Sequence, residues 1–353
     1  MQRDLVKKLQ CPNCHQSSNL SLEAFEEMPL NPDVVDHGLL ICRECGSWYP
    51  IECGVLEFLP QDMCYKKDRE DFVKRYRSKL SHLGLDCSIS IHASDADPRK
   101  HQQSHFDWYA KNDLQSYEEY EKSNFWQASD RLIIKNWSKA ISNGRCLLDV
   151  GCAQGRSTFN FMELDLDIVA FDISKRMIEK AVQKYREGSP KARASFFVGD
   201  ATTFPVESNV FDYVVLYGVL HHVPDPSQTC EEIYRVLKHG GCYMGHENNE
   251  SIFRRIFDFL QKVSPQWHEE AGEEPLISKD MLSSWFPENA SVKTTTSVFV
   301  PPHLINLLPW SLGYKVLHVS ERVGQYLPWL RDQGGLIICE VKKGNAAEPA
   351  GGS

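Results

Sequence analysis

Residues 147–156 read LLDVGCAQGR, a short apolar run that leads into a turn with two glycines. Such a turn after a buried strand lets the backbone approach a ligand closely before a helix begins. A glycine turn alone is weak evidence, because nicotinamide enzymes have a related turn with GxGxxG spacing. Here Gly151 and Gly155 are four residues apart, and Asp149 precedes the first by two. The stretch therefore predicts a strand, a ligand-binding turn and a helix.

Outward from this turn, short apolar runs alternate with helical patterns. The runs are CLLDV (146–150), IVAFD (168–172), SFFVGD (195–200), FDYVVLY (211–217) and CYMGHE (242–247). Residues 174–186 and 230–238 have apolar residues at the spacing of one buried helix face, and Gly240 and Gly241 should stop the second helix. The alternation predicts an α/β fold with a doubly wound parallel sheet.

Acidic residues close two of these runs. Asp172 ends the second run, where a carboxylate can accept hydrogen bonds from both hydroxyls of a ribose. Asp200 ends the third run. Either residue alone could be a helix N-cap or a surface acid. Three acids in register with successive strand ends, Asp149 included, favour a nucleoside-type cofactor.

With these residues, positions 142–343 resemble class I S-adenosylmethionine-dependent methyltransferases of the type 11 group, which includes ubiquinone and menaquinone biosynthesis C-methylases. The strongest local match is FDYVVLYGVLHHVPDP (211–226), followed by a helix and LKHGG (237–241). The resemblance implies a doubly wound seven-stranded class I methyltransferase sheet and S-adenosyl-L-methionine as cofactor. It implies the cofactor-binding residues Asp149, Gly151, Cys152, Ala153, Gly155, Asp172, Ile173, Asp200, Ala201 and Tyr217. Ala153 departs from the family pattern, which has a middle glycine there.

The same resemblance extends to a candidate lid. Residues 105–110, HFDWYA, are similar to the aromatic start of the lid helices of that group. We expect lid helices over 105–141, with Phe106 and Tyr109 near the sulfonium by cation–π attraction. Aromatic residues on helices are, however, more often core residues.

Methyl transfer from a sulfonium is an in-line displacement that needs positioning and a dry site more than acid–base chemistry. The candidates to deprotonate an acceptor are His221, His222 and His246, with Glu247 beside the last, on turns after strand ends. His221 is the first choice, although these residues could equally have a structural role. An Asn- or Asp-Pro-Pro-aromatic motif is absent where the chain reads Tyr217-Gly218-Val219-Leu220, which disfavours methylation of adenine or glutamine amino groups.

Four cysteines near the amino terminus have metal-ligand spacing. Cys11 and Cys14 form one CxxC pair, and Cys42 and Cys45 form another. Two such knuckles supply four thiolates to a closed tetrahedral zinc site, and the alternatives are chance redox pairs or disulfides. The unit resembles the zinc-bearing activator subunits of methyltransferases that modify tRNA and release factors. We expect Zn²⁺ to stabilise this ribbon without taking part in the chemistry.

Composition limits the functional classes. The chain has 353 residues and a formal net charge of −9, which opposes strong phosphate-backbone binding. No apolar stretch is long enough for a membrane span and residues 1–10 are polar, so we expect a cytoplasmic protein with free or metal-bound cysteines. Basic residues outnumber acids over 65–79, and a solvated helix is the simpler reading of that segment.

These observations predict a domain order. We expect a zinc ribbon at 1–60, a linker at 61–104, a methyltransferase domain at 105–343 and a disordered tail at 344–353. Residues 301–333 are too long a connector between the closing strands, so we expect an insertion with its own helices over the acceptor site. Residues 252–260 carry an apolar stripe beside Arg254, Arg255 and Lys262, as in helices that lie on anionic membranes; burial against the sheet is the alternative.

Three functions remain open. The favoured one is methyl transfer to a small-molecule or lipid-like acceptor, with possible peripheral membrane contact. The second is an rRNA or tRNA methyltransferase that uses the ribbon to hold RNA. The third is a zinc interaction protein that binds the cofactor without doing chemistry. The sequence does not name the acceptor or its attacking atom.

Overall fold

The computed structural model describes residues 1–16, 19–28, 31–87, 96–266 and 275–345. Its strands are β1 (Leu20–Met28), β2 (Asn31–Cys42), β3 (Trp48–Glu52), β4 (Val55–Glu57), β5 (Arg145–Val150), β6 (Leu166–Asp172), β7 (Arg193–Val198), β8 (Phe211–Tyr217), β9 (Leu237–Asn248), β10 (Ser291–Ser297) and β11 (Leu336–Lys342). Its α-helices are α1 (Lys66–His82), α2 (Pro98–Asn112), α3 (Leu114–Glu121), α4 (Asn124–Ala140), α5 (Lys175–Glu187), α6 (Pro226–Val236), α7 (Ile252–Val263), α8 (Lys279–Ser284), α9 (Pro302–Leu307) and α10 (Trp310–Tyr326).

The doubly wound sheet that the sequence predicts is confirmed. Strands β7, β6, β5, β8, β9, β11 and β10 lie side by side in that order, and the first five run parallel. β11 runs antiparallel to both of its neighbours. The chain order reverses at β5, which pairs with β6 on one side and β8 on the other. Ligands bind at such a switch point, beyond the carboxyl ends of the strands.

The expected strand count is too low, because the sheet does not stop at seven strands. β4 pairs in parallel with β7 through Leu56–Phe197 and Glu57–Val198, and this joins β1–β4 to the edge of the methyltransferase-type sheet. The result is one sheet of eleven strands. An unpaired edge strand leaves a row of unsatisfied backbone groups, and the amino-terminal unit covers that row.

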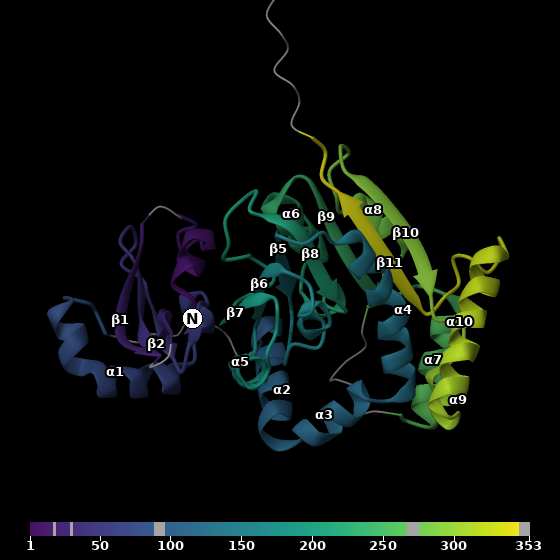
Figure 1. Ribbon diagram of the computed structural model, residues 1–353, viewed down its shortest axis with the longest axis horizontal. Coiled ribbons are helices and arrows are strands. Elements are labelled where there is room, and N and C mark those ends of the chain that lie inside the picture. Colours follow the sequence, from purple (N-terminus) through teal and green to yellow (C-terminus); the bar gives the residue numbers. More distant parts are fainter. Residues whose placement is uncertain (17–18, 29–30, 88–95, 267–274, 346–353) are drawn as a thin grey trace, which may run out of the picture.

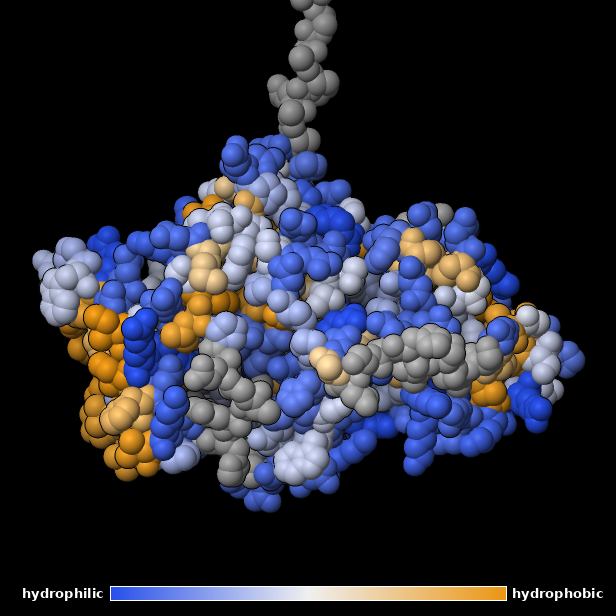
Figure 2. Space-filling model, turned by 180° about the vertical axis from the view of Figure 1, so that it is seen from behind, coloured by the Kyte–Doolittle hydropathy of each residue, from blue (hydrophilic) through white to orange (hydrophobic). Residues whose placement is uncertain are grey.

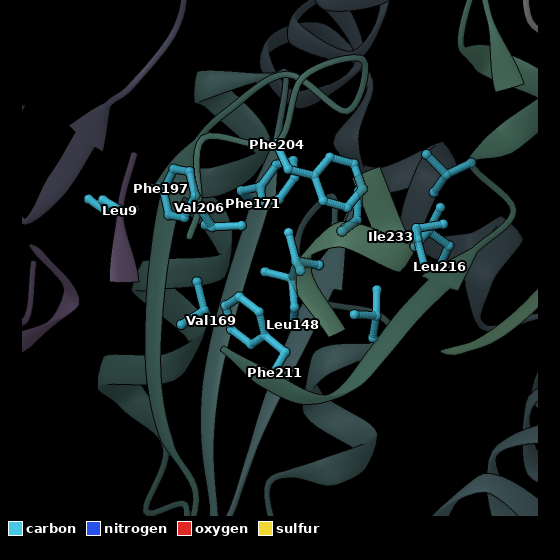
Figure 3. Packing of buried hydrophobic residues seen from close by; sticks show 14 of the residues in the cluster. Leu9, Leu148, Val169, Phe171, Phe197, Phe204, Val206, Phe211, Leu216 and Ile233 are labelled. Carbon is cyan, nitrogen blue, oxygen red and sulfur yellow. The ribbon is translucent and has the colours of Figure 1, made fainter. Parts of the chain in front are cut away.

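The amino-terminal unit also shares a hydrophobic core with the larger domain. Figure 3 shows Leu9 beside Phe197 and Val206, while Phe171 and Phe204 continue the same cluster inward. The rings of Phe58 and Phe197 are 6.2 Å apart, edge to face. The two parts therefore pack as one body.

Residues 61–104, expected as a linker, are largely helical where the structure describes them. α1 buries Phe72, Tyr76 and Leu80 against the amino-terminal strands. α2 begins at Pro98, capped by the Asp97 side chain, earlier than the predicted start at residue 105. The predicted disordered tail and part of the predicted linker lie outside the described residues (346–353 and 88–95).

The connector between β10 and β11 contains the two helices α9 and α10. Helices α9 and α10 pack against α4, and α7 lies beside them at the end of the molecule away from the amino-terminal unit (Figure 1). The side chain of His303 on α9 bonds the carbonyl of Ser264 just after α7, at 2.7 Å. No helix among the described residues is both long and apolar enough to pass through a lipid bilayer.

Candidate cofactor and acceptor pocket

A large pocket lies over the carboxyl ends of β5–β9. Its empty space is about 1370 Å³, a volume that includes space open to solvent. Its wall includes the predicted cofactor residues Gly151, Cys152, Ala153, Asp172, Ile173, Asp200, Ala201 and Tyr217, and the predicted histidines His221, His222 and His246. One pocket therefore brings together the predicted histidines and most of the predicted cofactor residues.

At the glycine turn, the backbone itself lines the pocket wall because Gly151 has no side chain. Gly151 has φ +68°, and a Cβ atom there would lie 2.6 Å from Val219 Cγ2. Ala153, at the position of the family's middle glycine, also adopts a left-handed φ of +46°. That conformation is strained for alanine, which explains why the family has glycine at this position.

Asp172 is the carboxylate nearest this turn. It accepts hydrogen bonds from the backbone N–H groups of Ala153 at 2.9 Å and Ser174 at 2.8 Å. Burial raises the pKa of this carboxyl to about 6, against the opposing effect of those two donors. The side chain is therefore fixed in orientation and is an anion above about pH 6.

Asp200 is held from two sides. It accepts hydrogen bonds from the backbone and side chain of Thr202, both at 2.8 Å, and its other oxygen pairs with Arg99 at 3.1 Å. Arg99, on the first turn of α2, also pairs with Asp62 at 2.9 Å. Sequence reasoning missed Arg99 because nothing local links residue 99 to residue 200.

Two predicted cofactor residues, Asp149 and Gly155, are absent from the pocket wall among the described residues. Asp149 is fully buried below the turn, where it accepts hydrogen bonds from the hydroxyls of Ser157 at 2.7 Å and Thr158 at 2.5 Å. Burial raises the pKa of Asp149 to about 7. In this structure Asp149 supports the turn through these two hydroxyls, and its predicted role toward the cofactor stays a prediction.

His221 and Glu247 form a buried pair. His221 Nδ1 lies 2.6 Å from Glu247 Oε2, while Glu247 Oε1 accepts hydrogen bonds from the backbone of Val219 and Leu220 at 3.0 and 2.8 Å. A carboxylate in this position orients the imidazole ring and favours the tautomer with the proton on Nδ1. The ring's Nε2 can then accept a proton.

His246 and His222 are neutral imidazoles on the pocket wall. Burial, with the nearby Arg156, holds the pKa of His246 well below its usual value; burial and His221 do the same to the pKa of His222. His246 is 4% exposed, and neither of its ring nitrogens has a hydrogen-bond partner among the described residues. A buried, unpartnered imidazole on a pocket wall is suited to a ligand's polar group.

The pocket wall also contains side chains that the sequence analysis did not propose as site residues. Arg156 pairs with Asp130 through two hydrogen bonds of 3.0 and 2.8 Å, and its guanidinium lies 4.8 Å from the Trp126 ring centre and 5.1 Å from that of Tyr217. The remaining unpredicted residues on the wall include Gln102, Tyr117, Tyr120, Glu121, Asn248 and Arg254. Phe106 lines the pocket as expected, but Tyr109 does not.

The expected insertion at 301–333 contributes no described residue to this wall. Its helices pack on α4, the helix that carries Trp126. A role of the insertion over the acceptor stays a prediction.

The four predicted cysteines come together in the amino-terminal unit. The sulfurs of Cys11, Cys14, Cys42 and Cys45 all lie within 4.8 Å of one another. Cys11 and Cys45 are 3.7 Å apart, and Cys14 and Cys42 are 3.6 Å apart. Four sulfurs around a tetrahedral zinc with bonds of about 2.3 Å would be separated by about 3.8 Å, so the cluster fits that ion.

Two known protein families match two separate segments of the chain, one in the larger domain and one in the amino-terminal unit. Residues 148–244 match the family described as "Methyltransferase domain", and residues 3–54 match the family described as "Trm112p-like protein". The first match spans β5 to β9, which contain the pocket's central strands. The second contains all four clustered cysteines.

Individual relatives are distant. The chain is 24% identical over 222 residues to 2-methyl-6-phytyl-1,4-hydroquinone methyltransferase 1 of Oryza sativa subsp. japonica, covering 60% of this chain and 66% of that one. It is 30% identical over 151 residues to the demethylmenaquinone methyltransferase of Lactococcus lactis subsp. lactis, covering 37% and 60%. The chain thus spans less than two thirds of the length of either relative.

A solved structure of the Haloferax volcanii Trm112 methyltransferase activator in complex with a methyltransferase aligns with a TM-score of 0.47 and 17% identity, over 68% of this chain and 98% of that one. The assignment of the two families rests on the two matched segments, the strand order and the cysteine cluster, and not on this structural alignment. The chain therefore joins a Trm112p-like unit to a class I methyltransferase domain.

Proposed function

We propose that the chain transfers a methyl group from S-adenosylmethionine to a small molecule with an apolar body and an ionisable hydroxyl. The observation that carries this proposal is the division of one pocket. Asp172 ends β6 and Asp200 follows β7, both on one side of β5 in the sheet order. The neutral, unpartnered His246 and the His221–Glu247 pair belong to β9 and the turn after β8, on the other side of β5.

The cofactor side fits the parts of S-adenosylmethionine. Asp172 would accept hydrogen bonds from the ribose hydroxyls, and the backbone after Asp200 would lie along the adenine. Glu121 has an unpartnered carboxylate oxygen on the wall and could accept a hydrogen bond from the methionine ammonium. S-adenosylmethionine supplies a methyl group on a cationic sulfur, and the protein's part is to orient it and exclude water.

On the acceptor side, His246 and His221 would hold and remove the acceptor's hydroxyl proton. His246 is uncharged at neutral pH, so an imidazole nitrogen is open for that proton. His221 is kept in one orientation by Glu247. The oxygen's electron pair would then form the bond to the methyl carbon directly, or a ring carbon conjugated with that oxygen would form it. The carbon–sulfur bond would break and release S-adenosylhomocysteine. After attack by a ring carbon, that carbon would lose its proton to solvent and restore the aromatic ring.

The apolar, quinol-like class of acceptor is supported by the relatives. The two relatives named above are methyltransferases of a phytyl-hydroquinone and of demethylmenaquinone. Both molecules combine a ring with a long apolar tail. The net charge of −9 makes an RNA acceptor, the second reading, less favourable.

For the amino-terminal unit we propose one structural zinc ion held by Cys11, Cys14, Cys42 and Cys45. The separations of the sulfurs support this ion. Four protein ligands leave no coordination position for water or substrate, so the ion would have no part in methyl transfer. A cytoplasmic location stays a proposal too.

The test is a methyl-transfer assay with isotopically labelled S-adenosylmethionine and a reduced prenylated naphthoquinone lacking the ring methyl. We expect a labelled, methylated product from the wild-type protein. We expect at least a hundredfold lower kcat for His246→Ala with cofactor affinity unchanged. His239→Ala, a matched change at an exposed histidine outside the pocket, should leave kcat unaltered.

Two results would overturn the proposal. One is the absence of S-adenosylmethionine binding in calorimetry by protein whose fold is intact, since the third reading, like the proposal, requires cofactor binding. The other is turnover on polar, water-soluble acceptors alone, which would refute the apolar class while leaving methyl transfer in place.

A further inference from the structure

Helices α7, α9 and α10 present a large apolar surface to solvent, which we call the three-helix face. Its exposed members are Ile252, Ile256, Phe259 and Val263 of α7, Leu304 and Leu307 of α9, and Leu312, Val319, Val323 and Tyr326 of α10, with Trp329 following. Leu307, Tyr326 and Trp329 are 83%, 84% and 71% exposed. Figure 2 shows apolar side chains gathered at the end of the molecule that these helices form.

The exposed residues follow helical periodicity, so they are not scattered exceptions. On α7 they recur at intervals of four, three and four residues, which places them on one stripe. Phe257, on another side of α7, is buried. The apolar stripe predicted on this helix therefore has two parts. The buried part includes Phe257, and the exposed part is covered by no residue of the described chain. Contiguous exposed apolar surface of this kind marks an interaction site.

Basic side chains border the apolar stripes in the same way on two helices. Arg255 and Lys262 are seven residues apart on α7, and Lys315 and Arg322 are seven apart on α10. At that spacing each pair forms a row beside its stripe, and all four residues are exposed. Glu321 of α10 is turned inward, where it accepts a hydrogen bond from the backbone of Val298 at 2.6 Å. Arg255 lies 3.8 Å from Glu250, and the other three basic residues leave this border with a positive charge in a chain of net charge −9.

From this pattern we infer that the three-helix face docks on an anionic lipid surface. Apolar stripes with basic rows beside them, and tyrosine and tryptophan at the end, suit the boundary between headgroups and acyl chains. A second copy of the chain fits less well, because apposed faces would bring like-charged rows together. No helix among those described is long enough to span a bilayer, so the contact is peripheral.

One helix of the face, α7, also contributes a residue to the pocket wall. Arg254 of α7 lines the pocket, and so does Asn248, which lies four residues before the helix begins. Docking through α7 would place the pocket's edge next to the lipid surface. The inference does not rest on the proposed methyl transfer, since lipid binding needs neither cofactor nor acceptor.

The experiment is flotation of the full chain with phosphatidylcholine vesicles, with and without phosphatidylglycerol. We expect binding to the anionic vesicles that is at least tenfold stronger than to phosphatidylcholine alone and that weakens with salt. Phe259→Ser with Leu307→Ser should reduce binding at least tenfold, and Lys262→Glu with Arg322→Glu should do the same. Met281→Ser, at an exposed apolar residue of α8 outside the face, is the matched control and should bind as the wild type does.

All substituted side chains are exposed, so circular dichroism and the melting temperature should stay unchanged. Equal binding to both vesicle types, or full binding by both double variants, would overturn the inference. So would a concentration-dependent dimer in sedimentation that Phe259→Ser with Leu307→Ser abolishes. An assay of methyl transfer to an acceptor solubilised in detergent distinguishes failure of this inference from failure of the proposed function. Activity in detergent without binding to vesicles would refute only the lipid inference.

Discussion

Replacement of Asp172 by asparagine should separate cofactor binding from the fold. The substitution preserves size but removes the negative charge and one of the two acceptor oxygens. Those oxygens now accept the N–H groups of Ala153 and Ser174 and face the pocket. Hydrogen bonds to a charged group contribute about 1.5–3 kcal/mol each. With partial compensation by the remaining oxygen, we expect a loss of about 2 kcal/mol, or a Kd for S-adenosylmethionine roughly thirtyfold higher.

The pH dependence gives an independent readout. The pKa of Asp172 is raised to about 6 by burial, and the cofactor favours the ionised form. Wild-type affinity should therefore be constant above that pKa and fall as pH decreases through it, about elevenfold by pH 5. The asparagine variant has no such group at this position, so its lower affinity should lose that slope.

Isothermal calorimetry from pH 5 to pH 8 provides both measurements. Asp165→Asn is the matched control, because Asp165 is exposed just before the opposite end of the same strand β6. Its affinity and slope should equal those of the wild type. If Asp172→Asn binds the cofactor as tightly as the wild type with the same slope, Asp172 is not the ribose-binding carboxylate.

Three further predictions concern Glu321, the cysteine cluster and Glu247. Burial raises the pKa of Glu321 to about 7, so the folded state takes up a proton that the unfolded state loses near pH 4.5, and stability falls as pH rises through 7. Glu321→Gln should thus raise the free energy of unfolding at pH 8 by about 2 kcal/mol and leave it nearly unchanged at pH 4, measured by urea denaturation. Elemental analysis should find one zinc ion per chain in the wild type and none in Cys11→Ser or Cys45→Ser. Because the core is shared, the whole protein should melt at a lower temperature in these variants, and an unaltered methyltransferase-domain transition would argue against that coupling. Glu247→Gln should lower kcat at least tenfold and shift its pH profile, because His221 loses the carboxylate that orients it, while an unshifted profile would leave Glu247 only a structural role.

The short apolar runs in the sequence were sufficient to predict the central strands of the methyltransferase sheet. The run at 211–217 coincides with β8, and the runs at 146–150 and 168–172 fall within β5 and β6. Buried parallel strands are continuous apolar runs, so their positions can be read without knowledge of distant contacts. The acid at the end of β6 was predicted for the same reason, since position on a strand end determines where a side chain projects.

The features that were missed depend on contacts between distant parts of the chain. β4 is only three residues long, and its pairing with β7 brings together residues far apart in the sequence. The Arg99–Asp200 pair spans a similar separation. On α7, periodicity indicated an amphipathic helix, but both Phe257 and Phe259 are apolar, and only packing decides which one faces solvent. The spacing of apolar residues predicts which side of a helix is apolar, but it does not predict which other elements pack against that side.

The contacts between the two parts suggest why a metal-stabilised unit is joined to this domain. The chain leaving β4 touches the pocket's supports directly: Tyr65 accepts a hydrogen bond from Lys175 N at 2.9 Å and donates to the carbonyl of Ile173 at 3.3 Å. Gln103 of α2 donates to the carbonyl of Met63 at 3.2 Å. Ile173 follows the proposed ribose-binding carboxylate, and α2 carries Phe106 on the pocket wall. Because the amino-terminal unit pairs with β7 and the chain leaving it contacts both elements, the proposed zinc ion would order the cofactor side of the pocket as well as this unit, although the ion itself would lie outside the pocket.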